Sequence, residues 1–502
     1  MKGNMMIDLF SQNRTSPPLW EFQDIGVKSI MEYVNTETDK ELRAGIAVFP
    51  TGTGKSLIIA HLAKRLGRPI LILQPSKELL EQNYEKFIDY GGFGSVYSAS
   101  VGTKHASSCT FATPGSIKGK GGLFRRILGV ETVIIDECHK DLPPDALGMV
   151  SQFLQELKPK VIVGLTATPI RLSQSPLGPI LNFITRTNPK IFHDVIHVVQ
   201  IKDICEKYWK KLNYKLYDFD EGKLRLKSTG QEYTDESIKD ALKYNNVNNN
   251  ICVELADHIL TKGVKAAMAF LDSIETCYRM QQWLEQRGIR TAVIEGKMSK
   301  KLRGELLGKY KKQEIQCVLN YGTLTTGFDY KALELLILGR PTNSFSLLYQ
   351  KIGRLVRRDE VIMEGLVIDM CNNVKRLGQI EDITFEYIPD FGWGMFNGEH
   401  LMSGRALNLV KLTKEDLRLR AQQKSKVPYT HVHFGKYKDV EITRVPDSYF
   451  KYCLEVMVFD SPIMKKFYNR IHEVMEEREN RISMTYDISE HTKRLIREGE
   501  MI

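Results

Sequence analysis

The chain has 502 residues, of which 42% are hydrophobic and 26% are charged. This balance is typical of a globular protein with roughly two to four domains. The sequence shows no run of about 18 apolar residues that could cross a bilayer and no secretory signal, so we expect a cytoplasmic protein with no membrane partner. The formal charge of +10 suits a polyanionic partner, although it is mild evidence in a chain of this length. The eight cysteines stand singly, without the Cys/His spacing of a zinc site, and we interpret them as reduced packing residues.

Short apolar runs alternate with amphipathic helical stretches, and this alternation occurs twice along the chain. It is typical of parallel α/β units, in which a helix follows each strand. The first group of expected strands is 46–49, 70–73, 133–135 and 161–165, and the second is 267–271, 292–294, 316–319, 335–338 and 366–368. The sequence therefore predicts an α/β fold with two tandem parallel-sheet lobes.

The same patterns divide the chain into five segments. We expect a polar tail at 1–17, a first lobe at 18–195, a connector at 196–245, a second lobe at 246–385 and a C-terminal α+β accessory region at 386–502. The connector is polar, rich in lysine and tyrosine, and ends in the asparagine-rich stretch YNNVNNN. The α/β pattern stops near residue 385, where the chain becomes rich in glycine and aromatic residues.

The strongest chemical signal is FPTGTGKS at 49–56, between an expected strand and an expected helix. Glycines let the backbone wrap so that successive N–H groups face phosphate oxygens, and the following helix N-terminus favours negative charge. Lys55 would then reach the β- and γ-phosphates of ATP, and Ser56 would bind Mg²⁺. A structural glycine turn would not explain the Lys-Ser pair. The nucleotide-binding residues expected here are Thr51, Gly52, Thr53, Gly54, Lys55 and Ser56.

A second signal is VIIDECH at 133–139, where an apolar strand ends in two acids. The carboxyl edge of a parallel sheet is where such folds bind ligands, so Asp136 is placed to hold the magnesium ion. Glu137 is then the expected base for the attacking water. Solvated acids after a strand are the alternative, but the phosphate loop about 80 residues upstream argues against it.

A third signal is QKIGRLVRR at 350–358, near the end of the second set of strands. A permanently charged guanidinium can stabilise the charge on a transferring phosphoryl group. Arg354 and Arg357 are the candidates, and Gln350 belongs to the same catalytic group. A basic helix face exposed to solvent is the alternative reading of this cluster.

Over roughly residues 18–375 these motifs resemble superfamily 2 helicases, in the order that such enzymes require. The resemblance implies two RecA-like lobes, ATP and Mg²⁺ as cofactors, and ATP hydrolysis coupled to movement on nucleic acid. The segment LWEFQ resembles the one whose glutamine, here Gln23, reads adenine. LQPSKELLEQ and FATPGS resemble strand-tracking motifs, and GLTATPIRL resembles the motif that couples hydrolysis to lobe movement. YGTLTTGFD resembles a second-lobe motif that touches nucleotide and nucleic acid and implies Asp329 as a nucleotide-binding residue.

Within the superfamily the motifs look most like those of RadD-type repair helicases and their phage relatives. That resemblance implies a monomer acting on single-stranded, forked or branched DNA in replication, recombination or repair, in a bacterial cell or a phage-infected host. RNA is a less expected substrate, because the signatures of DEAD-box RNA helicases are missing. A translocase on double-stranded DNA that does not unwind it and a non-catalytic clamp remain alternatives.

Two departures from the RadD-type pattern stand out. Trp20 lies near the position where that pattern has an arginine beside adenine, and it could stack on the base or simply pack. The C-terminal stretch 433–455 resembles a small FGKYKG module of some exonucleases, with no clear function.

Weaker candidates lie outside these motifs. His431 and His433 could share one face of a strand, but no third metal ligand is apparent. Two basic groups could contact phosphates or simply be solvated, namely Lys118, Lys120, Arg125 and Arg126, and Lys297, Lys300, Lys301 and Arg303. The aromatic residues Phe391, Trp393 and Phe396 could form a strand-separating wedge, although packing is the favoured explanation.

Overall fold

The computed structural model describes residues 16–37, 42–141, 148–175, 178–187, 191–227, 232–324, 328–389, 391–403, 413–418, 430–432, 435–457, 464 and 466–478. The chain divides into two compact units, Met1–Tyr387 with Trp393–Leu412, and Ile388–Gly392 with Thr413–Ile502. Among the described residues, no helix is both long and apolar enough to cross a membrane.

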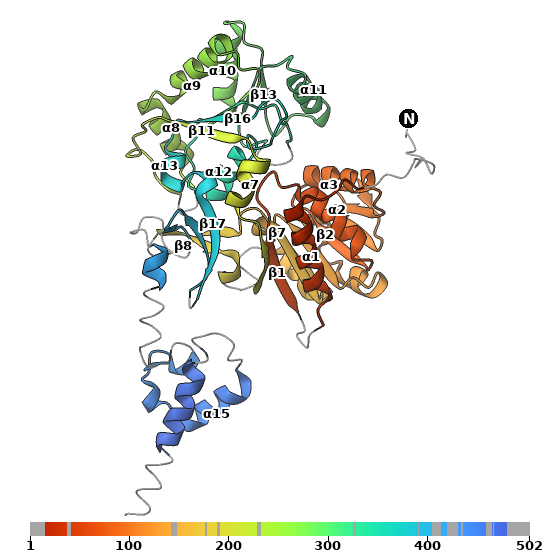
Figure 1. Ribbon diagram of the computed structural model, residues 1–502, viewed down its shortest axis with the longest axis vertical. Coiled ribbons are helices and arrows are strands. Elements are labelled where there is room, and N and C mark those ends of the chain that lie inside the picture. The colour runs from red at the N-terminus through yellow and green to blue at the C-terminus, as the bar shows by residue number, and fades with distance from the viewer. Residues whose placement is uncertain are drawn as a thin grey trace, which may run out of the picture. The chain divides into compact units, whose positions relative to one another are not determined.

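The first lobe of the larger unit is built on an eight-stranded sheet in which every strand except β4 runs parallel to its neighbours (Figure 1). All residues of β2 are buried, and successive side chains point to opposite faces, so both faces of the sheet are covered. The strand order is β10 (Asp194–Val198), β1 (Arg43–Val48), β7 (Val161–Thr166), β6 (Thr132–Asp136), β2 (Ile70–Leu73), β5 (Cys109–Ala112), β3 (Ser95–Ser98) and β4 (Thr103–Lys104).

Helices of the first lobe pack their apolar sides on this sheet. In α3, for example, Leu80, Asn83 and Phe87 are buried at helical spacing, and the Ser76 hydroxyl caps the helix by accepting from the Leu79 N–H. The helical segments are α1 (Glu21–Asn35), α2 (Lys55–Arg65), α3 (Lys77–Asp89), α4 (Pro114–Ile117), η1 (Leu123–Ile127), α5 (Cys138–Asp141), α6 (Met149–Leu157) and η2 (Ile184–Arg186). An antiparallel hairpin of β8 (Ile170–Ser175) and β9 (Gly178–Phe183) follows the sheet.

The second lobe has a six-stranded parallel sheet. Met268 and Phe270 of β12 face one apolar core, and Ala267 and Ala269 face another, so this sheet is also covered on both sides. The strand order is β11 (Lys211–Leu216), β16 (Glu364–Asp369), β15 (Leu335–Leu338), β12 (Ala267–Phe270), β14 (Cys317–Asn320) and β13 (Thr291–Ile294). The helical segments are α7 (Ile201–Tyr208), α8 (Asp235–Tyr244), α9 (Val247–Ala256), η3 (Asp257–Thr261), α10 (Ile274–Glu285), α11 (Lys300–Lys311), α12 (Phe345–Ile352) and α13 (Asn373–Leu377).

The prediction of an α/β fold with two parallel-sheet lobes is confirmed, and every strand predicted from an apolar run lies in one of the two sheets. The segment 196–245 is not a simple connector, however. It contains α7, α8 and β11, and β11 pairs with β16 at the edge of the second sheet. The sequence analysis missed this strand because it is not a continuous apolar run. Lysine and asparagine alternate with leucine and tyrosine in it, and none of its residues is buried, as an edge position allows.

A small three-stranded sheet follows the second lobe, formed by β17 (Ile383–Ile388), β18 (Gly392–Asn397) and β19 (His400–Leu401) after η4 (Ile380–Asp382). Its aromatic residues pack within the protein. Trp393 stacks on Phe183 of β9 with ring centroids 6.3 Å apart, and Phe396 is fully buried. These contacts favour the packing explanation for Trp393 and Phe396 over a strand-separating wedge.

The smaller unit has its own apolar core of Val432, Ile442, Val445, Phe450, Cys453, Phe467, Ile471 and Val474. Its elements include η5 (Gly435–Tyr437), η6 (Ile442–Arg444) and α15 (Asp447–Val456), and residues 466–478 are also helical. His431 forms only an isolated bridge to Glu441, not part of a longer strand, and His433 lies outside the described residues. Among the described residues no group of three or more His, Cys, Asp or Glu side chains could hold a metal ion.

Candidate nucleotide site between the two lobes

The phosphate loop connects β1 to α2 and is shaped by two glycines. Gly52 and Gly54 have φ angles of +77° and +76°, a conformation that favours glycine. A Cβ atom on Gly54 would also lie 2.8 Å from the Gln23 amide nitrogen. Lys55 and Ser56 follow as the first residues of α2, so their side chains leave the helix where its backbone N–H groups are unpaired.

Gln23 supports this loop from α1. Its Nε2 donates to the Thr53 carbonyl at 2.6 Å, and its Oε1 accepts from the Trp20 N–H at 2.8 Å. The neighbouring Trp20 ring packs against Tyr208 with centroids 4.6 Å apart, yet the residue remains 44% exposed. Trp20 therefore packs on the protein and still offers a ring surface to the site, so the structure accommodates both readings of this residue.

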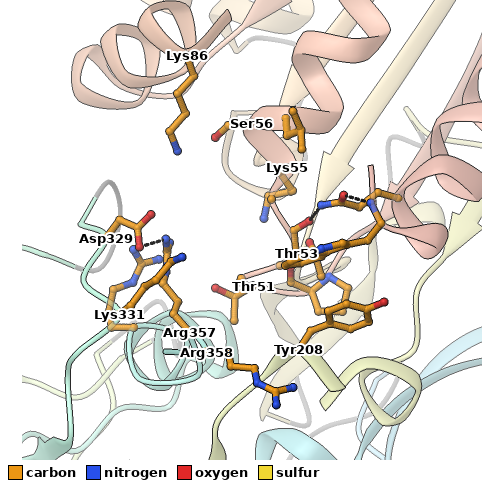
Figure 2. Close-up of a pocket in the computed structure, with 18 of the residues that line it drawn as sticks. Thr51, Thr53, Lys55, Ser56, Lys86, Tyr208, Asp329, Lys331, Arg357 and Arg358 are labelled. Carbon is orange, nitrogen blue, oxygen red and sulfur yellow. Dashed lines mark hydrogen bonds and ion pairs between the residues drawn. The ribbon is translucent and has the colours of Figure 1, made fainter. Parts of the chain in front are cut away.

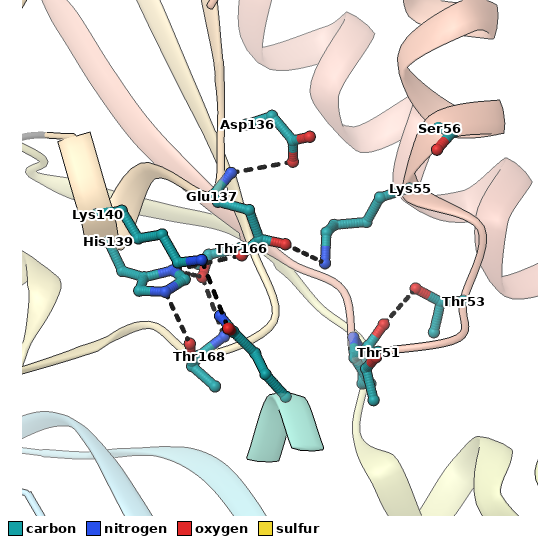
Figure 3. A network of polar contacts seen from close by, with 12 residues as sticks. Thr51, Thr53, Lys55, Ser56, Asp136, Glu137, His139, Lys140, Thr166 and Thr168 are labelled. Carbon is teal, nitrogen blue, oxygen red and sulfur yellow. Dashed lines mark hydrogen bonds and ion pairs between the residues drawn. The ribbon is translucent and has the colours of Figure 1, made fainter. Parts of the chain in front are cut away.

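The acid pair lies at the carboxyl end of β6, facing the loop (Figure 3). Glu137 Oε1 is 3.1 Å from Lys55 Nζ, and the Glu137 N–H donates to Asp136 Oδ1 at 2.9 Å. Glu137 has a φ of 48°, in the left-handed region that is costly for residues other than glycine. Strain of this kind persists where the surrounding structure enforces it, often at functional sites.

The two carboxyl groups have opposite shifts in pKa. Burial, together with the neighbouring charge of Glu137, raises the pKa of Asp136. Burial by itself also opposes ionisation of Glu137, but Lys55 outweighs it and holds the pKa of Glu137 below its usual value. Glu137 is therefore the carboxylate that stays ionised and able to accept a proton.

His139 lies behind Glu137. Its Nδ1 is 2.9 Å from Thr166 Oγ1 and 3.5 Å from Glu137 Oε2, and its Nε2 is 3.5 Å from Thr168 Oγ1. Burial lowers the pKa of His139 to about 4. The ring is neutral near pH 7, so its contact with Glu137 is polar but not an ion pair. Thr166 and Thr168 belong to the segment GLTATPIRL.

Ser56 and Asp136 present oxygen atoms of the kind that Mg²⁺ prefers. Both side chains contact the amide of Asn83. Ser56 Oγ donates to Asn83 Oδ1 at 2.6 Å, and Asn83 Nδ2 donates to Asp136 Oδ2 at 3.2 Å. One hydroxyl and one carboxylate fit an ion that takes its other ligands from phosphate and water, the usual arrangement for magnesium at nucleotides.

The second lobe contributes α12 and the segment after it. Arg357 forms an ion pair with Asp329. Arg354 is buried, and its guanidinium donates to the Phe328 carbonyl at 2.6 Å and the Gln350 carbonyl at 3.3 Å. Gln350 also accepts from Lys140 of the first lobe at 3.5 Å. Arg357 is therefore the arginine whose charge is held by one acidic side chain, whereas Arg354 is fastened to main-chain carbonyls.

These groups meet around a cavity of about 910 Å³ (Figure 2). Every residue that the sequence predicts for nucleotide binding, metal binding or catalysis lines it, namely Gln23, Thr51, Gly52, Thr53, Gly54, Lys55, Ser56, Asp136, Glu137, Asp329, Gln350, Arg354 and Arg357. The sequence did not point to Asn83, Lys86, Tyr208 or Tyr349, which line the same cavity. None of these four carries a charge pattern or spacing that marks it in advance.

The weaker basic candidates do not line this cavity. Lys118, Lys120, Arg125, Arg126, Lys297 and Lys301 are exposed, and the side chain of Lys300 lies outside the described residues. Arg303 has a structural task, since its guanidinium donates to the carbonyls of Glu295 and Gly296 at 2.9 and 3.1 Å.

A phosphate loop and an acid pair on one parallel-sheet lobe, with arginines on a second, are the parts of a two-lobe P-loop ATPase. Residues 18–171 match the family described as "Type III restriction enzyme, res subunit", and residues 248–359 match "Helicase conserved C-terminal domain". The chain therefore carries both domains of an ATP-dependent helicase of superfamily 2.

Several curated relatives are similar to this chain. A 51.5 kDa protein of a Lactococcus phage is 24% identical over 61% of the chain and 61% of its own length. The mitochondrial protein irc3 of Schizosaccharomyces pombe, described as a candidate ATP-dependent helicase, is 27% identical over 66% of the chain and 55% of its own length. Its namesake IRC3 of Saccharomyces cerevisiae is 23% identical over 45% of the chain and 32% of its own length. The chain thus spans less than two thirds of each of these relatives.

The solved structures with a similar fold include two from restriction enzymes. A type ISP restriction-modification enzyme, LlaBIII, bound to DNA has a TM-score of 0.52 at 16% identity, covering 71% of this chain and 28% of that one. A fragment of a candidate HsdR subunit of a type I restriction enzyme from Vibrio vulnificus also has a TM-score of 0.52, at 18% identity, covering 71% of this chain and 65% of that one. At these identities the similarity concerns the fold alone.

Proposed function

We propose that this protein hydrolyses ATP in the cavity between its lobes and uses the cycle to move along DNA. The observation that carries the proposal is the convergence of loop, acid pair and arginines on one cavity, with Glu137 held 3.1 Å from Lys55. Nucleotide binding by the first lobe alone would not explain why Arg357 of the second lobe lines the same cavity.

Each side chain has a distinct task in the proposed reaction. Lys55 binds the β- and γ-phosphates, and its salt bridge keeps Glu137 ionised until a water molecule is in position. Ser56 and Asp136 would hold Mg²⁺, which when bound neutralises phosphate charge. Glu137 accepts the proton of the attacking water. Arg357 exchanges Asp329 for the developing negative charge on the phosphoryl group.

Movement follows from placing these groups on two lobes. The catalytic set is complete only when the lobes are closed on the nucleotide, so ATP favours closure and hydrolysis favours opening. If each lobe holds the phosphodiester backbone in turn, one cycle advances the protein along a strand. Contacts to the backbone carry little base information, so we expect weak sequence preference.

Forked or branched DNA is the substrate we propose, with repair, recombination or replication as the setting. The motif resemblance to RadD-type helicases and their phage relatives supports DNA. We further propose a monomer that acts in the cytoplasm of a bacterial cell or phage-infected host. RNA is the less favoured substrate.

A second candidate is translocation along double-stranded DNA without strand separation. The first domain matches a family named for a restriction enzyme subunit, and two solved structures with a similar fold come from restriction enzymes. In that case the protein would displace the third strand of a DNA triplex but would not unwind the duplex of a forked DNA.

One set of assays tests both candidates. ATPase activity should be measured with single-stranded, duplex, forked and four-way DNA and with RNA, using Glu137→Gln as the inactive control. Strand displacement from a fork and displacement of a triplex strand then separate unwinding from translocation. An ATPase that no nucleic acid stimulates, or one stimulated more by RNA than by any DNA, contradicts the proposal.

A further inference from the structure

Asn83 lies in α3 with only 3% of its surface exposed, and its side chain joins three elements of the first lobe. Its Oδ1 accepts from Ser56 Oγ of α2 at 2.6 Å. Its Nδ2 donates to Asp136 Oδ2 of β6 at 3.2 Å and to Gln74 Oε1, just after β2, at 3.0 Å. No sequence motif points to this residue, since it follows the segment LQPSKELLEQ without belonging to it.

The chemistry of the partners determines which way the amide faces. A carboxylate that ligates Mg²⁺ is ionised and only accepts hydrogen bonds, so in the magnesium-bound state Asp136 requires the nitrogen of Asn83 on its side. The oxygen must then face Ser56, whose hydroxyl supplies the hydrogen. The reverse orientation would place the amide oxygen of Asn83 against an oxygen of the ionised Asp136 carboxylate, with no hydrogen between them.

The same arrangement prepares both oxygen atoms for a cation. The Ser56 hydroxyl has one hydrogen, and donating it to Asn83 leaves its lone pairs free. Asp136 is held at both oxygens, with Oδ1 accepting from the Glu137 N–H and Oδ2 from Asn83. Each Asp136 oxygen keeps a further lone pair. Asn83 therefore holds the two expected magnesium ligands in one orientation without occupying the positions that the ion needs.

We propose that Asn83 is the positioning residue of the magnesium site, acting through Ser56 and Asp136 and not by touching metal or nucleotide. This inference rests on the proposed function, which assigns those two residues to Mg²⁺. Groups that orient metal ligands in this way typically account for 10- to 100-fold in metal affinity or activity. A residue that merely fastened α3 to the sheet would affect folding stability but not the concentration of magnesium that the enzyme requires.

The test is a magnesium titration of Asn83→Leu, which is similar in size but apolar, and of Asn83→Ala. Both variants should need at least about tenfold more Mg²⁺ for half-maximal ATPase activity. A second measurement is binding of a fluorescent ATP analogue. Without Mg²⁺, in the presence of EDTA, its affinity should match that of the wild type, and the gain on adding Mg²⁺ should shrink.

Leu80→Ala is the matched control, because Leu80 is a fully buried apolar residue of the same helix. It should lower the melting temperature and leave the magnesium requirement unchanged. If Asn83→Leu fails to fold, the role of Asn83 can still be tested with Asn83→Ala. In that variant, adding Mg²⁺ with ATP should raise the melting temperature less than it does in the wild type.

Ser56→Ala and Asp136→Asn distinguish a wrong role for Asn83 from a wrong assignment of the magnesium site. If these variants raise the magnesium requirement and both Asn83 variants behave like Leu80→Ala, the role of Asn83 is overturned and the metal site stands. If none of the four variants changes the requirement, the assignment of the metal site is itself wrong, and the inference falls with it.

Discussion

The indole nitrogen of Trp209 donates a hydrogen bond to the carbonyl of Thr51 in the phosphate loop, at 3.1 Å. Trp209 is 3% exposed and precedes the edge strand of the second sheet. Its backbone forms a bridge to Arg357, and the next residue, Lys210, donates its N–H to the Val356 carbonyl at 2.9 Å. One residue thus connects the phosphate loop to the segment that carries the proposed arginine finger.

We therefore expect Trp209→Phe to lower kcat/KM for ATP about fivefold. Phenylalanine keeps an aromatic ring but lacks the N–H, and the loss of one hydrogen bond is worth about 1 kcal/mol. Steady-state ATPase kinetics with saturating DNA provide the measurement. Trp283→Phe is the control, because Trp283 lies against Arg287 in the second lobe, outside the cavity lining. Equal values for the two variants would contradict a coupling role for Trp209.

Lys55→Ala and Glu137→Gln should each abolish hydrolysis, but by different routes. Removing Lys55 deletes a phosphate contact and should weaken nucleotide binding. Glu137→Gln removes only the proton acceptor and should bind ATP as well as the wild type does or better. Equilibrium binding of a fluorescent ATP analogue, measured beside phosphate release, separates the two effects. Wild-type turnover in either variant would refute the role of that residue.

Arg357→Ala should reduce ATP hydrolysis about a thousandfold while ATP and DNA still bind, as expected for a group that stabilises transition-state charge. Single-turnover hydrolysis and DNA binding should be measured on the same preparation. Arg279→Ala, at an exposed arginine paired with Glu275 on its own helix, is the control. A loss smaller than about tenfold would transfer the finger role to Arg354.

The lowered pKa of the buried His139 imidazole predicts how the stability of the fold depends on pH. Burial lowers the pKa of the folded-state imidazole to about 4, whereas an unfolded histidine titrates near 6.5. The unfolded state therefore takes up a proton first as the pH falls, and stability present above about pH 6.5 is lost progressively down to about pH 4. The loss at pH 5 amounts to ~2 kcal/mol.

Thermal unfolding at pH 7 and pH 5 tests this dependence. The wild type should lose more stability between the two pH values than His139→Gln, whose side chain does not titrate. Parallel losses in the two proteins would show that His139 is protonated equally in the folded and unfolded states.

The smaller unit offers a place to cut the chain. Because Trp393 packs on Phe183, a cut near residue 385 would remove part of the larger unit. We expect a protein ending at Leu412 to keep DNA-stimulated ATPase activity, since every proposed catalytic group precedes the cut. It should lose preference for forked over blunt DNA. Fork and blunt-duplex ATPase rates, and the steep salt dependence expected of phosphate contacts, provide the comparison. Complete loss of ATPase activity in a folded truncated protein would place part of the motor after Leu412.

The sequence by itself determined the two-lobe α/β fold, and it named the motif residues that the structure brings together around the cavity between the lobes. Buried parallel strands are continuous apolar runs, and the chemistry of phosphate and magnesium binding depends on contiguous groups such as Lys55 with Ser56 and Asp136 with Glu137. Signals of this kind are local, so they can be recognised in the sequence without knowing which strands are neighbours. The edge strand β11 was missed for the opposite reason, because an exposed strand need not be apolar.

Only the tertiary structure decided which side chains act on these local motifs from elsewhere in the chain. Asn83 reaches Ser56 and Asp136 across 27 and 53 residues of sequence, and Trp209 reaches Thr51 across 158. The structure also distinguishes Arg357, paired with Asp329, from Arg354, fastened to main-chain carbonyls, although both stand in the same motif. Hydrogen bonds between distant segments depend on how strands and helices pack. No periodicity or charge pattern in the sequence indicates which group a single asparagine or tryptophan will contact.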